Sequence, residues 1–226
     1  MLLQLSQTFA QTGDSLRMQN APKHAVGFSS QHKINLRPFI IPVALTATGI
    51  YYTYHTGLID RYAVRDWRNE NYPDFHTHAD DYLQFVPAAA VYVLDLTGMK
   101  ARNDVRTQTI KLLESELIMG ILVYSLKNTT SVERPDGSAD NSFPSGHTEQ
   151  AFVSATFLHK EFGKGRPWIS IAGYAVATSV GLLRVLNNRH WITDVIAGAG
   201  MGMLSVELAY LPLFQPGKKS KHKPAN

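Results

Sequence analysis

The sequence contains no cysteine among its 226 residues. Thiol catalysis, thiolate metal sites and disulfide bonds are therefore excluded for this chain, although the absence does not identify a cellular compartment. A chain of this length can bury a core large enough to fold without disulfides. Stretches with strict polar–apolar alternation are also scarce, so strands are expected to contribute little and helical periodicity dominates.

Charge of either sign is modest. The chain has 22 Lys and Arg against 18 Asp and Glu, which gives a net charge of +4. Much of the excess lies in the final stretch GKKSKHKPAN and in short clusters, not along one face. Nucleic-acid binding usually needs a contiguous basic face, so we expect no nucleic-acid partner.

Long hydrophobic runs are few and short. Residues 39–55 and 167–183 each run 17 residues without Asp, Glu, Lys or Arg, while 82–99 and 195–214 carry one carboxylate each. Such lengths are at the lower limit for a membrane span. The mean hydropathy of −0.14 is low for a membrane protein, and residues 109–126 include a lysine and two glutamates, which are costly in lipid. An integral membrane bundle and a soluble helical domain both remain open.

The periodicity predicts one all-α domain over residues 36–214, a bundle of about six main helices embedded in or associated with a membrane. A polar N-terminal arm is expected over residues 1–35, whose start MLLQLSQTFAQTG resembles the end of a secretory signal. A basic tail is expected over residues 215–226. The predicted helices are 38–54, 58–70, 79–98, 103–127, 146–162, 167–186 and 191–212.

Loop charges indicate a topology if the apolar helices cross a membrane. Four clusters of Lys and Arg then fall on one side, which is the cytoplasmic side by the positive-inside rule. The loops at 56–81, 128–146 and 184–194 fall on the other side. The clusters are Lys33 and Arg37; Lys100, Arg102 and Arg106; Lys160, Lys164 and Arg166; and the C-terminal lysines.

Three short motifs supply converging cations and an anion-binding turn. KNTTSVERP spaces Lys127 and Arg134, and RVLNNRHWITD begins with Arg184. Lysine and the planar arginine forks suit the several oxygens of a phosphate. In PSGH, Ser145 at a helix N-cap would leave the amides of Gly146 and the following histidine free to bind an anion. Each motif alone is weak, because basic residues and Ser-Gly caps are common.

The same motifs hold two histidines, which are enough for a nucleophile and an acid. Asp194 follows His190 by four residues and could fix its tautomer and stabilise the imidazolium. His190 would attack phosphorus through its other nitrogen. His147, beside the anion-binding turn, could protonate the leaving oxygen. The cations already neutralise the developing charge, so no metal or other cofactor is expected; HTHADD (76–81) is the alternative metal site, in a loop expected to be polar.

The three motifs together resemble the signature of the type 2 phosphatidic acid phosphatase and vanadium haloperoxidase superfamily, Lys-x6-Arg-Pro, Pro-Ser-Gly-His and Ser-Arg-x5-His-x3-Asp. The match covers residues 127–194 in the same order. The resemblance implies a helical core, a phosphohistidine mechanism, catalytic roles for His190, His147 and Asp194, and phosphate binding by the remaining motif residues. Those residues are Lys127, Arg134, Ser145, Gly146 and Arg184.

Two departures from the pattern stand out. Leu183 replaces the serine that precedes the arginine of the third motif, so one polar contact near the phosphate is expected to be missing. Only eight residues separate Pro135 from Pro144. A short loop suggests an open site that suits a bulky, lipid-anchored substrate.

We therefore predict a metal-independent phosphatase that hydrolyses a phosphomonoester or diphosphate of a membrane lipid. The expected place is the bacterial inner membrane, with the active site facing the periplasm. A soluble periplasmic acid phosphatase is the first alternative, and a vanadium-dependent haloperoxidase is the second. The resemblance implies several lipid substrates, among them phosphatidic acid, phosphatidylglycerol phosphate, polyprenyl diphosphate and lipid A.

Overall fold

A computed structural model describes residues 35–211, and every regular element in this range is a helix, which confirms the all-α prediction. The predicted polar arm (1–35) lies outside the described residues, apart from Asn35. The predicted basic tail (215–226) also lies outside them. A single 3-10 turn, η1 (Arg37–Phe39), leads into α1 (Ile40–Tyr54). The other helices are α2 (Arg61–Asn71), α3 (Ala79–Leu83), α4 (Val86–Leu96), α5 (Val105–Thr130), α6 (Gly146–Phe162), α7 (Pro167–Leu186) and α8 (Ile192–Ala209).

Local sequence signals explain most helix boundaries. The carboxylate of Asp60 accepts hydrogen bonds from the amides of Tyr62 and Ala63 and starts α2, as expected for an aspartate N-cap. The single helix predicted over residues 79–98 is wrong, because the structure divides it into α3 and α4. Pro87 lies in the first turn of α4; its ring lacks an amide hydrogen and clashes with the preceding helical turn.

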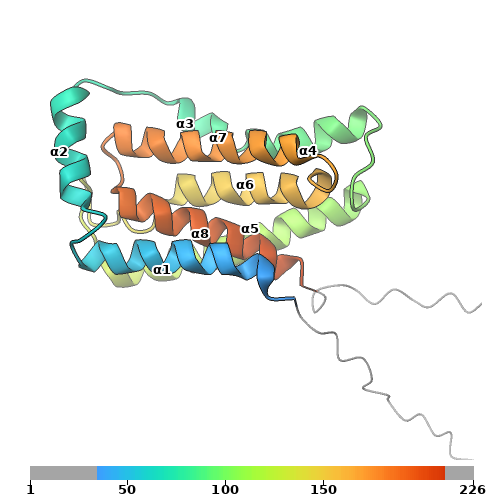
Figure 1. The fold of residues 1–226 in the computed structure, drawn as a ribbon, viewed down its shortest axis with the longest axis horizontal. Coiled ribbons are helices and arrows are strands. Elements are labelled where there is room, and N and C mark those ends of the chain that lie inside the picture. The colour runs from blue at the N-terminus through green and yellow to red at the C-terminus, as the bar shows by residue number, and fades with distance from the viewer. Residues whose placement is uncertain (1–34, 212–226) are drawn as a thin grey trace, which may run out of the picture. The chain divides into compact units, whose positions relative to one another are not determined.

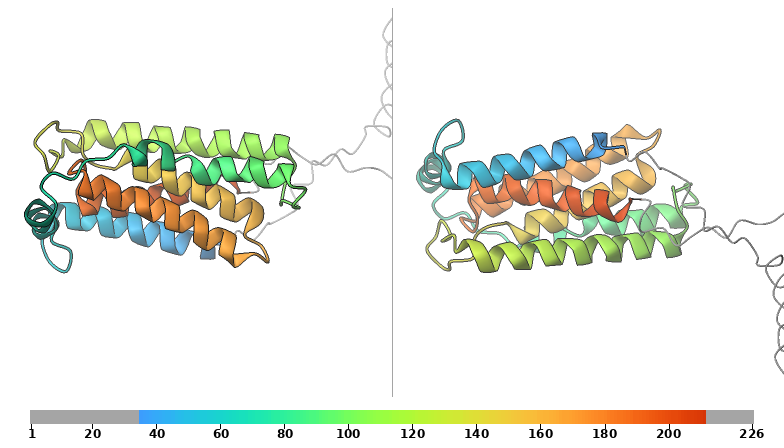
Figure 2. Two further views of the ribbon diagram at one scale, coloured as in Figure 1. Left: turned by 90° about the horizontal axis from the view of Figure 1, so that it is seen from above. Right: turned by 90° about the horizontal axis from the view of Figure 1, so that it is seen from below.

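Helix α8 lies at the centre of the bundle and packs against α1, α5 and α6 (Figures 1 and 2). Small residues on α8 make this close approach possible. A Cβ at Gly200 would collide with the backbone of Pro42 on α1, and a Cβ at Gly202 would collide with the carbonyl of Glu149 on α6. Small residues are the usual means by which helices in membranes pack at short distance.

The two ends of the bundle differ in their chemistry. At one end α5 and α7 finish, α6 and α8 begin, and α2 lies across the bundle (Figure 1). The connections at this end are residues 55–60, 131–145 and 187–191. The opposite end carries the connections 97–104 and 163–166, with the basic residues Lys100, Arg102, Lys164 and Arg166. The three sequence motifs all lie at the first end, which we call the motif end.

The outer surface of the bundle is rich in large apolar side chains. Exposed ones follow α1, α5 and α7, including Ile41, Leu117 and Ile171, which are 64%, 66% and 69% exposed. Among the described residues, α7 and α8 are long and apolar enough to cross a membrane. Apolar patches of this extent on a folded chain normally mark contact with lipid or with another protein.

Candidate active site

The phosphate-binding cations predicted from the sequence lie together at the motif end. Lys127 is in the last turn of α5, Arg134 is in the following loop, and Arg184 is in the last turn of α7. Asn141 tethers two of them: its carbonyl accepts from Lys127 Nζ at 2.7 Å and its side-chain oxygen accepts from Arg134 Nε at 3.1 Å. Burial and the nearby charges of Arg189 and Arg184 lower the pKa of Arg134. Cations held this close repel one another, and an anion between them would relieve that repulsion.

The start of α6 supplies backbone donors beside these cations. Ser145 is the N-cap residue, as predicted, with extended backbone angles. Its hydroxyl makes no capping hydrogen bond; instead it pairs with the Thr148 hydroxyl at 2.9 Å. The helix geometry leaves the amides of Gly146 and His147 without intrahelical acceptors. The positive end of the helix dipole adds to the attraction for an anion.

His190 lies in the connection between α7 and α8 and its side chain is 3% exposed. Its Nδ1 is 2.8 Å from the carbonyl oxygen of Ser142. A carbonyl oxygen only accepts, so Nδ1 carries the hydrogen and the lone pair of the neutral ring is on Nε2. Burial lowers the pKa of His190 to about 4, against the opposing effect of Asp194. The ring is therefore neutral at physiological pH, and its lone pair is on Nε2.

Asp194 supports this arrangement differently from the sequence-based expectation. His190 precedes α8, whereas Asp194 lies in the first turn of that helix. Asp194 Oδ2 lies 3.6 Å from His190 Nδ1, whereas the shorter contact of Nδ1 is with the Ser142 carbonyl. The same oxygen accepts from the Ser142 hydroxyl at 2.5 Å and from the Trp191 amide at 3.0 Å. Asp194 thus fixes the loop that holds His190 and places a negative charge beside the ring.

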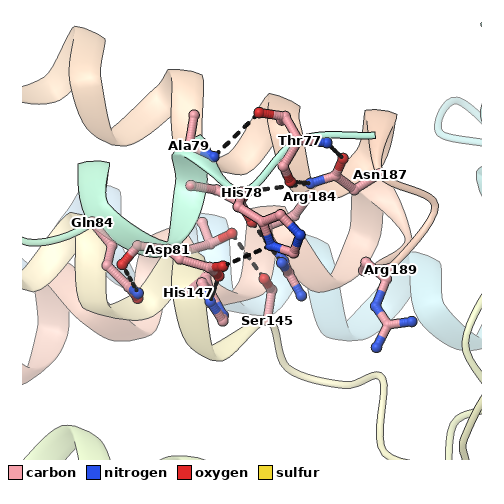
Figure 3. Close-up of polar contacts among 12 residues, drawn as sticks. Thr77, His78, Ala79, Asp81, Gln84, Ser145, His147, Arg184, Asn187 and Arg189 are labelled. Carbon is pink, nitrogen blue, oxygen red and sulfur yellow. Dashed lines mark hydrogen bonds and ion pairs between the residues drawn. The ribbon is translucent and has the colours of Figure 1, made fainter. Parts of the chain in front are cut away.

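His147 has a carboxylate partner that comes from a distant part of the sequence. Its Nε2 is 2.9 Å from Asp81 Oδ1, and the other oxygen of Asp81 is 3.2 Å from His78 Nδ1 (Figure 3). These two histidines lower the pKa of Asp81, so this carboxyl is ionised. Burial and the charge of Arg184 lower the pKa of His147, and the contact with Asp81 opposes that shift. The sequence indicates HTHADD only as a candidate metal site, and Asp81 lies 66 positions from His147.

The neighbouring Asp80 is fully buried and holds Arg184. Arg184 Nη1 donates to Asp80 Oδ2 at 2.5 Å, and the Asn187 amide donates to Oδ1 at 3.2 Å. Arg184 Nε is buried and has no acceptor among residues 35–211, so it remains available to a ligand. Asp80, Asp81 and His147 are close enough together to hold a metal ion, but Arg184 already engages one of these carboxylates.

The sequence is similar to a known protein family and to curated proteins. Residues 108–216 match the family model of the PAP2 superfamily. The lipid A 1-phosphatase of Porphyromonas gingivalis is 42% identical over 151 residues, 65% of this chain and 33% of that protein. The bacitracin transport permease protein BcrC of Bacillus licheniformis is 42% identical over 66 residues, 29% of this chain and 30% of that protein. The chain therefore spans about a third of the length of these curated relatives.

Two solved structures resemble the fold. The transmembrane PAP2-type phosphatidylglycerolphosphate phosphatase of Bacillus subtilis superposes with a TM-score of 0.50 at 23% identity, covering 75% of this chain and 94% of that one. LpxE of Aquifex aeolicus gives a TM-score of 0.48 at 21% identity, covering 64% of this chain and 92% of that one. The first shows that this helical arrangement occurs in a transmembrane protein.

Proposed function

We propose that the chain, whose residues 108–216 match the family model of the PAP2 superfamily, is a metal-independent phosphatase acting on a phosphorylated membrane lipid. The observation that carries the proposal is the setting of His190. Its Nδ1 is held by the Ser142 carbonyl, its pKa is lowered to about 4, and the predicted phosphate cradle lies at the same end of the bundle. A neutral, oriented imidazole beside converging cations is what nucleophilic attack on a phosphate ester needs.

In the proposed first step, Lys127, Arg134, Arg184 and the α6 amides bind the phosphate oxygens. His190 Nε2 attacks phosphorus while the bond to the leaving oxygen breaks. His147 gives its proton to that oxygen, so the leaving group departs in protonated form. It is an alcohol if the substrate is a monoester and a lipid phosphate if the substrate is a diphosphate. Asp194 stabilises the positive charge that develops on His190, as a buried carboxylate does beside other catalytic histidines.

The second step returns the enzyme to its starting state. A water attacks the phosphohistidine and transfers a proton to His147, which now acts as the base. The phosphorus–nitrogen bond breaks, phosphate is released, and His190 regains its Nε2 lone pair. The Asp81 carboxylate holds the His147 ring during both transfers, and it favours the protonated form that the first step consumes.

The apolar surface supports a lipid substrate. The exposed side chains of α1, α5 and α7 would contact acyl chains, and α7 and α8 meet the length needed for a span. Relatives also act on lipids, to judge from a lipid A 1-phosphatase and a phosphatidylglycerolphosphate phosphatase. A bilayer would then surround the bundle, and the headgroup of the substrate would enter at the motif end.

We further propose that the motif end faces the periplasm. The exposed cations Lys100, Arg102 and Lys164 lie at the opposite end, where the positive-inside rule puts the cytoplasm. Cysteines introduced singly at Asp74 and at Lys164 would test this, because the chain has no cysteine of its own. A membrane-impermeant maleimide applied to intact spheroplasts should label only the first; labelling of the second alone would reverse the orientation.

The main test of the function is phosphate release from a substrate panel. The purified chain in detergent should release phosphate from phosphatidic acid, phosphatidylglycerol phosphate, a polyprenyl diphosphate or lipid A faster than from soluble monoesters. With a 32P-labelled substrate, the wild type should trap an acid-labile phosphoenzyme that His190→Ala lacks. An acid-stable phosphoenzyme, or faster turnover of soluble esters together with release from membranes by carbonate, would contradict the lipid phosphatase.

A further inference from the structure

A cationic cavity lies beside the proposed nucleophile. It has a volume of about 550 Å³ and is lined by Arg61 and Arg65 from α2, by Arg134, and by Trp191. A small neighbouring void is lined by the same two α2 arginines and by His190. The first turns of α2, which lies across the motif end (Figure 1), therefore border the catalytic site. Neither arginine belongs to the three sequence motifs.

The positions of these two arginines are fixed by aromatic rings. Asp60 starts α2, so Arg61 and Arg65 are one helical turn apart on the same face. Their guanidinium carbons lie 4.7 and 5.4 Å from the centre of the Trp191 ring. Trp191 follows the nucleophile in the chain, and its ring nitrogen donates to the Glu133 carbonyl at 2.7 Å. The cations are thus held against the residue next to His190.

The guanidinium groups have donors to spare. Arg61 Nη1 is buried and has no acceptor among the described residues, while its Nη2 donates to the Tyr62 hydroxyl at 2.8 Å. Arg65 pairs with the adjacent Asp66 at 2.8 Å, an exposed pair of the kind that contributes little. A guanidinium has five donors, so both arginines can bind an anion without giving up these contacts.

The acidic groups of the cavity do not cancel its charge. Asp136 lines the cavity, but it forms an ion pair with Arg189 at 3.0 Å. Glu133 also lines it, and this residue is exposed. Among the described residues, Arg61 and Arg134 have no ion pair and Arg65 pairs only with Asp66, while Glu133 is the one carboxylate of the lining without an ion pair. A buried donor without an acceptor is costly in a folded protein, and an anion in this cavity would satisfy it.

We propose that Arg61 and Arg65 bind a second, non-reacting phosphate group of the substrate, so that the site selects lipids with two phosphates. This inference rests on the proposed phosphatase function. Arg134 borders both sites, so one phosphate in the catalytic cradle and another against α2 would share it. Planar guanidinium forks match phosphate oxygens in pairs. The second phosphate could be the inner group of a diphosphate or a separate ester on the same headgroup.

The test compares substrates that differ by one phosphate. Farnesyl diphosphate is paired with farnesyl monophosphate, and bisphosphorylated lipid A with a monophosphorylated form. The wild type should show a higher kcat/KM for the two-phosphate member of at least one pair. In the double variant Arg61→Gln/Arg65→Gln that preference should fall about 10- to 100-fold, the effect of losing charged hydrogen bonds. The ratio cancels any loss that a disturbed fold causes on both substrates alike.

Arg102→Gln/Arg106→Gln is the matched control, because it removes two exposed arginines at the opposite end. It should keep the wild-type ratio. If the kcat/KM ratio of Arg61→Gln/Arg65→Gln falls for the farnesyl pair alone, the second phosphate belongs to a diphosphate. If it falls for the lipid A pair alone, the second phosphate is a separate ester. Both results support the subsite. An unchanged ratio, or an equal fall in the control variant, overturns it. If the wild type releases phosphate from none of the four substrates, the proposed function itself fails.

Discussion

Replacing Asp194 by asparagine would test how His190 is activated. The new side chain could still accept from the Trp191 amide and the Ser142 hydroxyl through its oxygen, so the loop should stay in place. What is lost is the negative charge 3.6 Å from His190 Nδ1. In the attack on phosphorus this nitrogen keeps its hydrogen while the ring becomes positive, so the charge of Asp194 acts more strongly on the transition state than on the neutral ground state.

The size of the effect follows from that distance. Coulomb's law at an effective dielectric constant of about 20 gives about 4.6 kcal/mol for a full charge at 3.6 Å. A half-developed charge would give about 2.3 kcal/mol. The kcat/KM for phosphate release should therefore fall between about 50-fold and 2,500-fold. Purified wild type and Asp194→Asn, assayed on one lipid substrate in the same detergent, would measure this.

The pH profile gives a second and independent readout. His190 must be neutral to attack, so the kcat/KM of the wild type should fall as the pH drops through about 4. Asp194 favours the charged ring and raises this pKa, so its neutralisation should move the acid limb to still lower pH. Substrate ionisation is common to both proteins and does not affect the comparison. Asp74→Asn, the loss of an exposed carboxylate, is the control. A kcat/KM within threefold of wild type and an unmoved acid limb would refute the electrostatic role.

Four further predictions follow from the structure. His190→Ala should reduce phosphate release at least about 1,000-fold while the chain still folds, and near-normal turnover would remove the nucleophile assignment. Asp81→Asn should slow hydrolysis of alkyl phosphates about 10-fold or more but spare p-nitrophenyl phosphate, whose leaving group needs little help from His147; equal losses would indicate a structural role instead. Orthovanadate should inhibit while EDTA leaves turnover intact, and strong EDTA inhibition would point to a metal at Asp80, Asp81 and His147. Gly202→Val should destabilise the fold by about 2 kcal/mol, because its side chain would strike the Glu149 carbonyl; thermal unfolding in detergent would show an unchanged midpoint if that contact can relax.

Helix boundaries could be predicted where the sequence has clear capping and helix-breaking residues. Residues 146–162 and 167–186 were predicted and observed as α6 and α7, because Ser-Gly and Gly-Arg-Pro signals bound them. The break between α3 and α4 was missed, since hydrophobic periodicity continues across Pro87. Periodicity reports which face of a helix is apolar, whereas a proline stops the hydrogen-bond ladder without changing that pattern.

In the candidate site, residues that are close in the sequence could be predicted, and contacts between distant residues could not. The motif residues were placed from the sequence, since each motif is short and its residues share a turn or a helix end. The partners of the two histidines were not. Asp81 reaches His147 from α3 across 66 positions, and the Ser142 carbonyl reaches His190 across 48. The position of a backbone oxygen cannot be inferred from the pattern of side chains. The HTHADD stretch indicated a metal site and not a partner for His147.

Those partners give the two histidines different surroundings. His190 is nearly fully buried and donates to an uncharged carbonyl, so its environment favours the neutral ring. His147 is 32% exposed and contacts an ionised carboxylate; burial and the charge of Arg184 lower its pKa, and the contact with Asp81 opposes that shift. Titratable groups with different surroundings are the usual basis for dividing acid and nucleophile; here the ring of His190 is the more deeply buried of the two, and that of His147 contacts the Asp81 carboxylate. The burial of His190 and the contact of His147 with Asp81 therefore support the proposed roles of acid and nucleophile, in addition to the motif pattern.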